Sequence, residues 1–96
     1  MRILAEREKT HGNYDLSANV SQMLKEILRV QPNWEKLTDR QRESLEMICL
    51  KLSRIVSGSA SFRDHWDDVE GYARLGGESV TDNDQIKLDL TLGGLK

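Results

Sequence analysis

The sequence predicts an all-α protein, a compact bundle of about four helices over residues 1–76, followed by a C-terminal tail over residues 77–96. Apolar residues recur at intervals of three and four in three separate segments, which is the spacing of one helix face. Glycine, proline and capping residues separate these segments. Alternation with a period of two, which is typical of strands, is confined to the tail. We therefore expect one short N-terminal helix and three longer ones.

The first two helices are separated by a predicted turn. The first spans about Arg2–Lys9 and ends before the Gly-Asn pair at 12–13, which favours a tight turn. Asp15 or Ser17 is expected to cap the second helix, and Pro32 ends it because the residue before a proline disfavours helical geometry. The apolar stripe of this helix consists of Leu16, Val20, Met23, Leu24, Ile27 and Leu28.

The third helix has the strongest periodic signal and is predicted over about Asp39–Ser57. Thr38 and Gln41 have the spacing of a capping box at its start, and Gly58 stops it. Its buried face is predicted to consist of Leu45, Ile48, Cys49, Leu52, Ile55 and Val56.

The fourth helix is predicted over Phe62–Leu75, with Ser61 and Asp64 as a second capping pair and Gly76 as its C-cap. Its residues expected to point inward are Phe62, Trp66, Val69 and Ala73. Beyond it, residues 86–92 alternate as a strand does. A lone strand has no partner in a helical bundle, so the tail is expected either to be flexible or to pair with an edge from another chain.

The composition is typical of a soluble globular domain. Charged residues make up 31% and hydrophobic residues 38% of the 96 residues, which favours a folded helical protein over a disordered one. No apolar run approaches the roughly 20 residues that a membrane span needs, and the N-terminus lacks the apolar stretch of a signal peptide. The single cysteine, Cys49, lies in an apolar stretch, so we interpret it as a core residue and expect a cytoplasmic location.

The charge balance disfavours nucleic-acid binding. Through Leu75 the chain carries 12 basic and 12 acidic residues, so the net charge of −2 comes from the tail. Proteins that bind nucleic acids usually carry a basic surplus or a basic stripe, because contacts to phosphate dominate their affinity.

Paired acidic residues suggest a metal site, although their spacing alone does not establish one. Glu43 and Glu46 lie three residues apart, as do Asp64 and Asp67, and His65 with Asp68 forms an alternative pair. Two such helices facing each other across a groove could hold Mg²⁺, which prefers oxygen ligands and often binds phosphates as well. With 16 acidic residues, roughly 2.6 pairs at this spacing are expected by chance, and the chain has three.

Two basic residues on the third helix have two interpretations. Lys51 and Arg54 lie near its apolar face, one or two turns beyond Glu46. Either residue could pair with Asp67 or Asp68 on the next helix as a structural ion pair, which is the interpretation we favour. The alternative is that Lys51 or Arg54 binds a phosphate or carboxylate. His11 in the predicted turn could be a ligand or a base, although an exposed turn histidine is usually neither, and we interpret His65 as a satisfied side chain on a helix face.

Three motifs in order resemble a family of small phage and prophage proteins of unassigned function. They are the segment AEREKTHG at 5–12, the segment LEMI followed by KLSRI at 45–55, and the segment HWDDVEGYA at 65–73. The resemblance covers about residues 4–75. That family is in turn similar, more distantly, to phage nucleotide-modification-associated domains and to the MazG-like all-α nucleotide pyrophosphohydrolases.

The resemblance to MazG-like enzymes implies an activity and a set of site residues. These enzymes bind Mg²⁺ through an ExxE helix and an ExxD helix, often as dimers or tetramers, and hydrolyse nucleoside triphosphates to monophosphate and pyrophosphate. Glu43 and Glu46 match ExxE, whereas the second motif begins with Asp64 or His65 in place of glutamate. The implied metal ligands are Glu43, Glu46, Asp64 and Asp68, with Glu46 and Asp68 as catalytic residues and Lys51 or Arg54 near phosphate.

The sequence thus leaves two hypotheses for the function. The first is a Mg²⁺-dependent protein that binds or hydrolyses a nucleotide and works as a homo-oligomer, most simply a dimer. The second is a non-enzymatic phage accessory protein that binds a host or phage protein in the host cytoplasm, with its helices as scaffold. Neither hypothesis involves a membrane.

Overall fold

The computed structural model describes residues 2–78 and residue 80, with side chains from Glu6 onward, and this part of the chain is all-α as predicted. The alternating segment at 86–92 lies outside the described residues. No helix in the described part is long and apolar enough to cross a membrane. The elements are α1 (Arg2–His11), α2 (Tyr14–Arg29), a short 3-10 helix (Trp34–Lys36), α3 (Asp39–Ser57) and α4 (Arg63–Gly77).

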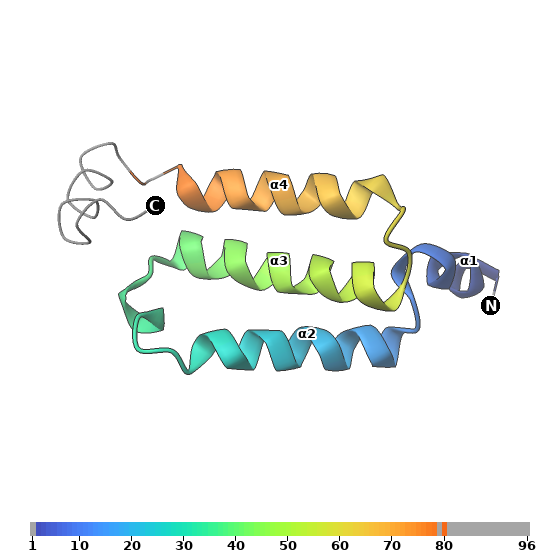
Figure 1. Cartoon of the computed structure of the whole chain (residues 1–96), viewed down its shortest axis with the longest axis horizontal. Coiled ribbons are helices and arrows are strands. Elements are labelled where there is room, and N and C mark those ends of the chain that lie inside the picture. The colour runs from blue at the N-terminus through green and yellow to red at the C-terminus, as the bar shows by residue number, and fades with distance from the viewer. Residues whose placement is uncertain (1, 79, 81–96) are drawn as a thin grey trace.

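The three long helices lie side by side, with α3 in the middle and α2 and α4 on either side of it (Figure 1). Neighbouring helices run in opposite directions because short connections join them. The short helix α1 lies at the end of this layer where α2 begins and α3 ends, and it contacts both of them. The residues that approach α1 therefore come from the start of α2 and the end of α3.

Local capping chemistry explains most helix boundaries and corrects two predictions. The capping box of Thr38 and Gln41 is present at the start of α3, which spans the residues predicted for it. The cap of α2 is Asn13, whose side-chain oxygen accepts from Leu16 N–H at 3.1 Å, so the predicted caps at 15 and 17 are wrong. The N-cap of α4 is Phe62, which has no side-chain bond, and the helix runs through Gly77.

Two glycines allow the connection before α2 to cross the connection after α3. Gly12 has a φ of +80°, and a Cβ built there would lie 2.1 Å from the carbonyl oxygen of Ser57. A Cβ on Gly58 would lie 2.3 Å from the carbonyl oxygen of Thr10. At the same crossing, Ser59 N–H donates to the Thr10 carbonyl at 3.0 Å. No other residue type fits at either position, so this crossing fixes α1 against the end of α3.

The helices pack through small residues, and half of the residues predicted to point inward on α3 and α4 are exposed. Cys49 and Ile55 are the only buried hydrophobic residues among those described, whereas four serines and His65 are buried. The prediction of a buried face on α3 is wrong for Leu45, Leu52 and Val56, and that on α4 is wrong for Trp66 and Ala73, all of them exposed. Serines at the contacts allow the helices to approach closely, so the larger apolar side chains project from the layer. The buried serines are Ser17, Ser21, Ser44 and Ser53.

We predict that Gly12→Ala destabilises the protein by more than about 2 kcal/mol, because alanine disfavours positive φ and its methyl group clashes with the backbone of residue 57. Gly71→Ala is the matched control. Gly71 lies on α4 with open space around it, and alanine should stabilise the helix there by about 0.5–1 kcal/mol. Urea unfolding of both variants measures the difference. Equal stabilities would contradict the proposed role of the crossing.

Candidate functional site

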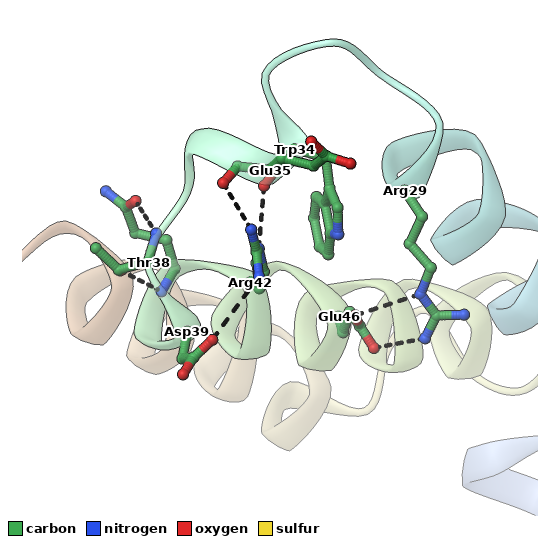
Figure 2. Close-up of polar contacts among 8 residues, drawn as sticks. Arg29, Trp34, Glu35, Thr38, Asp39, Arg42 and Glu46 are labelled. Carbon is green, nitrogen blue, oxygen red and sulfur yellow. Dashed lines mark hydrogen bonds and ion pairs between the residues drawn. The ribbon is translucent and has the colours of Figure 1, made fainter.

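Glu46, one of the predicted metal ligands, is bound by an arginine of the neighbouring helix. The guanidinium of Arg29 on α2 donates from Nη2 to Oε1 of Glu46 at 2.7 Å and from Nε to Oε2 at 3.3 Å (Figure 2). The hydrogen bonds from Arg29 hold the pKa of Glu46 below its usual value. Both carboxylate oxygens are engaged, so Glu46 joins α2 to α3 in this structure.

Asp68, the other predicted catalytic residue, pairs with Lys51. Lys51 Nζ lies 2.8 Å from Asp68 Oδ2, and the lysine side chain is only 12% exposed. This hydrogen bond is the main cause that lowers the pKa of Asp68. The structural ion pair that we favoured for Lys51 is therefore present and joins α3 to α4. Asp67 instead pairs with Arg63 on its own helix at 2.9 Å.

The four predicted metal ligands do not gather around one point within a single chain. Eight residues separate Glu43 from Lys51, a distance of about 12 Å along the helix axis, and Asp68 lies beside Lys51. Glu46 projects toward α2, whereas Asp64 and Asp68 belong to α4 on the other side of α3. In the described part of the chain, no three metal-ligating side chains form a cluster. One chain by itself does not fit a magnesium centre, and the predicted Mg²⁺ site stays a prediction.

A groove of about 650 Å³ lies between α1, α2 and the end of α3. Its lining residues come from α1 and its end at Gly12, from the first part of α2 and from the last part of α3. Four of its lining residues are cationic or become cationic on protonation, and one, Glu8, is acidic. The basic ones are Arg7, His11, Lys25 and Arg54, and the main polar uncharged ones are Tyr14, Ser17, Ser21 and Gln22.

Arg7 and Arg54 make the groove electropositive. Among the described residues, no carboxylate lies within 4.0 Å of either guanidinium, although the chain forms six such pairs elsewhere. Burial is the largest cause that lowers the pKa of Arg54, and the positive charge of Arg7 is the next. The charge of Asp68 acts on Arg54 in the opposite direction, but from beyond ion-pair distance. Two arginines therefore line the groove without a carboxylate in contact in the described part of the chain, an arrangement that an anion between them would stabilise.

His11 lies between the arginines and the start of α4. Its pKa is lowered below 6.5 by burial first, and then by the charges of Arg7 and Arg54, with smaller effects of His65 and Lys51. Its Nδ1 lies 2.6 Å from the Thr10 hydroxyl, which donates its own proton to the Arg7 carbonyl at 3.2 Å. With the hydroxyl proton directed at that carbonyl, Nδ1 is the donor to the hydroxyl oxygen, and in this tautomer Nε2 gains a proton when the ring becomes charged.

The ring of His65 packs against the ring of His11 and holds it in place. The His65 side chain is 1% exposed, and its ring packs edge-on against that of His11, with 4.7 Å between the ring centres. Its Nε2 donates to the Thr10 carbonyl at 2.8 Å. The interpretation of His65 as a structural, satisfied side chain agrees with these contacts, which attach the start of α4 to the end of α1.

Ser21 supplies a polar atom without a partner. Ser21 is 2% exposed and lines the groove, and its Oγ has no hydrogen-bond partner among the described residues. A buried hydroxyl left without a hydrogen bond costs on the order of 1–3 kcal/mol. A ligand that occupied the groove and bonded to Oγ would remove this cost.

The sequence identified one residue of this groove in advance. Arg54 was a candidate for binding phosphate, and it lines the groove, whereas Lys51 pairs with Asp68. Arg7, Lys25 and Ser21 were missed because they lie on other helices and belong to no motif spacing. The one signal that could have found Arg7 is its place four residues before His11, on the same face of α1.

Comparisons with known proteins place the chain in a family and go no further. The model of a family described as "Domain of unknown function (DUF6378)" matches residues 1–80. Neither a curated protein nor a solved structure matches the chain.

We predict that the two partners of the Lys51–Asp68 pair differ in their effect on stability. Asp68→Asn leaves a largely buried ammonium group without its charged partner and should cost about 1–3 kcal/mol. Lys51→Met removes that buried charge and should cost less. Asp67→Asn is the control, since its pair with Arg63 is exposed and contributes about 0–1 kcal/mol. Chemical denaturation checks the order, and a larger loss in Lys51→Met than in Asp68→Asn would contradict it.

Proposed function

The chain belongs to the DUF6378 family, a domain of unknown function, and we propose that it binds a nucleoside polyphosphate in the groove between α1, α2 and α3. The observation that supports the proposal is that Arg7 and Arg54 line the groove without an ion-pair partner among the described residues. They lie beside His11 and the Ser21 hydroxyl, which has no hydrogen-bond partner there. The distant resemblance to MazG-like proteins and nucleotide-modification-associated domains points to the same class of ligand.

The proposal assigns the phosphates to the inner part of the groove. Guanidinium groups bind phosphate oxygens through paired, charge-assisted hydrogen bonds, so Arg7 and Arg54 are suited to hold them. Lys25 adds a third positive charge from α2. Ser21 would donate its hydroxyl proton to a phosphate oxygen, which gives the buried oxygen a partner.

The outer part of the groove suits a nucleoside. A volume of about 650 Å³ lies in the range of small-molecule sites. Tyr14 lines the groove and is 77% exposed, so its ring is available to stack on a base. The neighbouring amide of Gln22 can donate to and accept from a base or a sugar. These contacts do not distinguish one base from another.

Binding is proposed as the function, and hydrolysis is a separate part of the test. The MazG-like reaction needs carboxylates around Mg²⁺, and Glu46 and Asp68 are here engaged by Arg29 and Lys51. Nucleotides also bring Mg²⁺ with their phosphates, so binding in the groove does not depend on a metal site built from these carboxylates.

A second candidate function is binding to a host or phage protein. The observation that favours it is the row of exposed apolar side chains on α2 and α3, which lies away from the groove. The two functions use different surfaces, so variants of the groove separate them.

We predict that Arg54→Gln weakens binding of a nucleoside triphosphate at least tenfold, since it removes a charge-assisted contact to phosphate. Arg63→Gln, on the exposed start of α4, is the control and should bind as the unchanged protein does. Calorimetric titration with ribo- and deoxynucleoside triphosphates, with and without Mg²⁺, measures the dissociation constants, and the unphosphorylated nucleosides should not bind.

This titration tests binding and, with one added measurement, hydrolysis. Absence of binding for every nucleotide, with Mg²⁺ and without it, would overturn the proposed function. Pyrophosphate release followed in the same samples tests hydrolysis. Release that Glu46→Gln and Asp68→Asn each abolish without unfolding the chain supports the MazG-like activity, and release that survives in either variant refutes these two catalytic residues.

We predict that the affinity for the nucleotide rises as the pH falls below about 6.5. Burial first, and then the charges of Arg7 and Arg54, lower the pKa of His11 in the free protein, whereas a phosphate that accepts from Nε2 stabilises the protonated ring. The bound phosphate raises the pKa of His11, so binding takes up a proton, and a gain of roughly three- to tenfold is expected between pH 7.5 and 5.5. The same titration of His11→Gln corrects for protonation of the ligand itself. An identical pH profile in both proteins would exclude His11 from the site.

A further inference from the structure

We infer that the exposed apolar residues of α2 and α3 form the interface of a homodimer, with a second copy of this chain as the occupant. We name this surface the apolar face. It consists of Leu16, Met23 and Ile27 of α2 and its C-cap residue Val30, together with Leu45, Leu52 and Val56 of α3, each of which is between 36% and 71% exposed.

These residues lie on one side of the helical layer, opposite the groove. On α2, the buried Ser17 and Ser21 mark the side that packs toward α3, and the groove is lined by the residues that follow them, Ala18 and Gln22. The apolar face begins with Leu16, which precedes Ser17. Successive residues of an α-helix are rotated by about 100° around its axis. When a residue packs toward the neighbouring helix, the residue before it therefore projects to one side of the layer and the residue after it to the other side.

The same order holds on α3, which runs in the opposite direction. Ser53 is fully buried, Arg54 after it lines the groove, and Leu52 before it belongs to the apolar face. Reversing the direction of a neighbouring helix keeps equivalent positions on one side of a layer. Leu45 and Val56 lie seven and four residues from Leu52, so they project to the same side as Leu52.

The apolar face contains no charged residue. Its positions on α2 recur after seven, four and three residues, and those on α3 after seven and four, which is the spacing that packs one helix pair onto another. The opposite side of the same helices carries Lys25 and Arg54. One side of the layer is therefore suited to protein packing and the other to an anionic ligand.

Few hydrophobic side chains are fully buried in the described part of a single chain, which leaves apolar surface for a partner to cover. Only Cys49 and Ile55 are buried hydrophobic residues there, whereas seven large apolar side chains of the apolar face meet solvent. If the fold needs a partner to cover this surface, that partner must be available wherever the chain is produced. A second copy of the same chain is always available in this way. Two-fold pairing places the same apolar residues on both sides of the interface, with no unpaired charge buried.

The size of the apolar face agrees with a stable dimer. The exposed parts of its seven side chains amount to roughly 700 Å² on each chain, close to the 800 Å² per partner that a stable interface of standard size buries. Surfaces of this composition are typical of permanent homodimers, whose interfaces are more apolar than those of transient complexes.

The test begins with the full chain. Sedimentation equilibrium should give twice the chain mass of 11.0 kDa, and the thermal midpoint should rise with protein concentration because dissociation and unfolding are coupled. A chain that is monomeric and unfolds at the same temperature from about 1 to 100 µM would overturn the inference. A monomer would mean that other residues of the same chain cover the apolar face, and a complex with a different protein would likewise contradict a second copy.

A charge placed on the apolar face should abolish the dimer. Ile27→Glu adds a carboxylate at a side chain that is 58% exposed in one chain and would be buried in the dimer. Gln22→Glu adds the same charge to an exposed position of the same helix on the groove side, opposite the apolar face, and should remain dimeric.

Together the two variants test the dimer interface even if Ile27→Glu does not fold. A monomer, or a chain that is unfolded at every concentration while Gln22→Glu stays folded, supports the dimer, since a lone chain would tolerate glutamate at an exposed position. A dimer with an unchanged thermal midpoint in Ile27→Glu would place the interface elsewhere. Arg54→Gln should not change the mass, which separates this result from failure of the proposed nucleotide binding.

Discussion

The backbone crossing at Gly12 and Gly58 determines how the other parts of this protein meet. Because neither residue has a Cβ, the end of α1 can lie directly on the end of α3, with the Thr10 carbonyl bonded to Ser59 and His65. Without that approach Arg7 and His11 would not reach Arg54, and the groove would lose one of its three walls. A steric constraint in two turns thus positions charged side chains from helices that are far apart in the sequence.

Because the helices contact one another through serines, the layer has one apolar side and one polar, basic side. Small residues at the contacts of α2 with α3, and of α3 with α4, bring the helix axes close together and leave the large apolar side chains on the surface. Polar and basic residues line the groove on the opposite side. The ion pairs Arg29–Glu46 and Lys51–Asp68 hold α3 to its two neighbours from either flank. The proposed ligand and the inferred second copy therefore use different surfaces of one scaffold.

Local signals in the sequence predicted the helices well. The capping box at Thr38 and the stop at Gly58 gave the boundaries of α3, because capping depends on residues that are close in sequence. The direction in which the helices bury their side chains was predicted poorly. Periodicity locates the apolar stripe of α2, but it does not tell whether the same chain or another one covers it, and the contacts here belong to Ser17 and Ser21.

The candidate site shows the same division between local and long-range information. Arg54 was identifiable as an isolated basic residue beside an apolar stripe, whereas the metal ligands predicted from ExxE spacing lie on different sides of α3 in one chain. Spacing within a helix determines which face a side chain occupies, and only the tertiary arrangement decides what that face meets. The basic groove arises from the crossing of two turns, which no spacing rule describes.

Titration of the ¹⁵N-labelled full chain with pyrophosphate shows whether phosphate binds between Arg7 and Arg54. We expect saturable shifts of the backbone amide signals of Gly12 and Ser21 and of the guanidinium signals of Arg7 and Arg54, with the signals of the apolar face unchanged. Absence of saturable shifts, or shifts centred on Glu43 and Glu46, would contradict it.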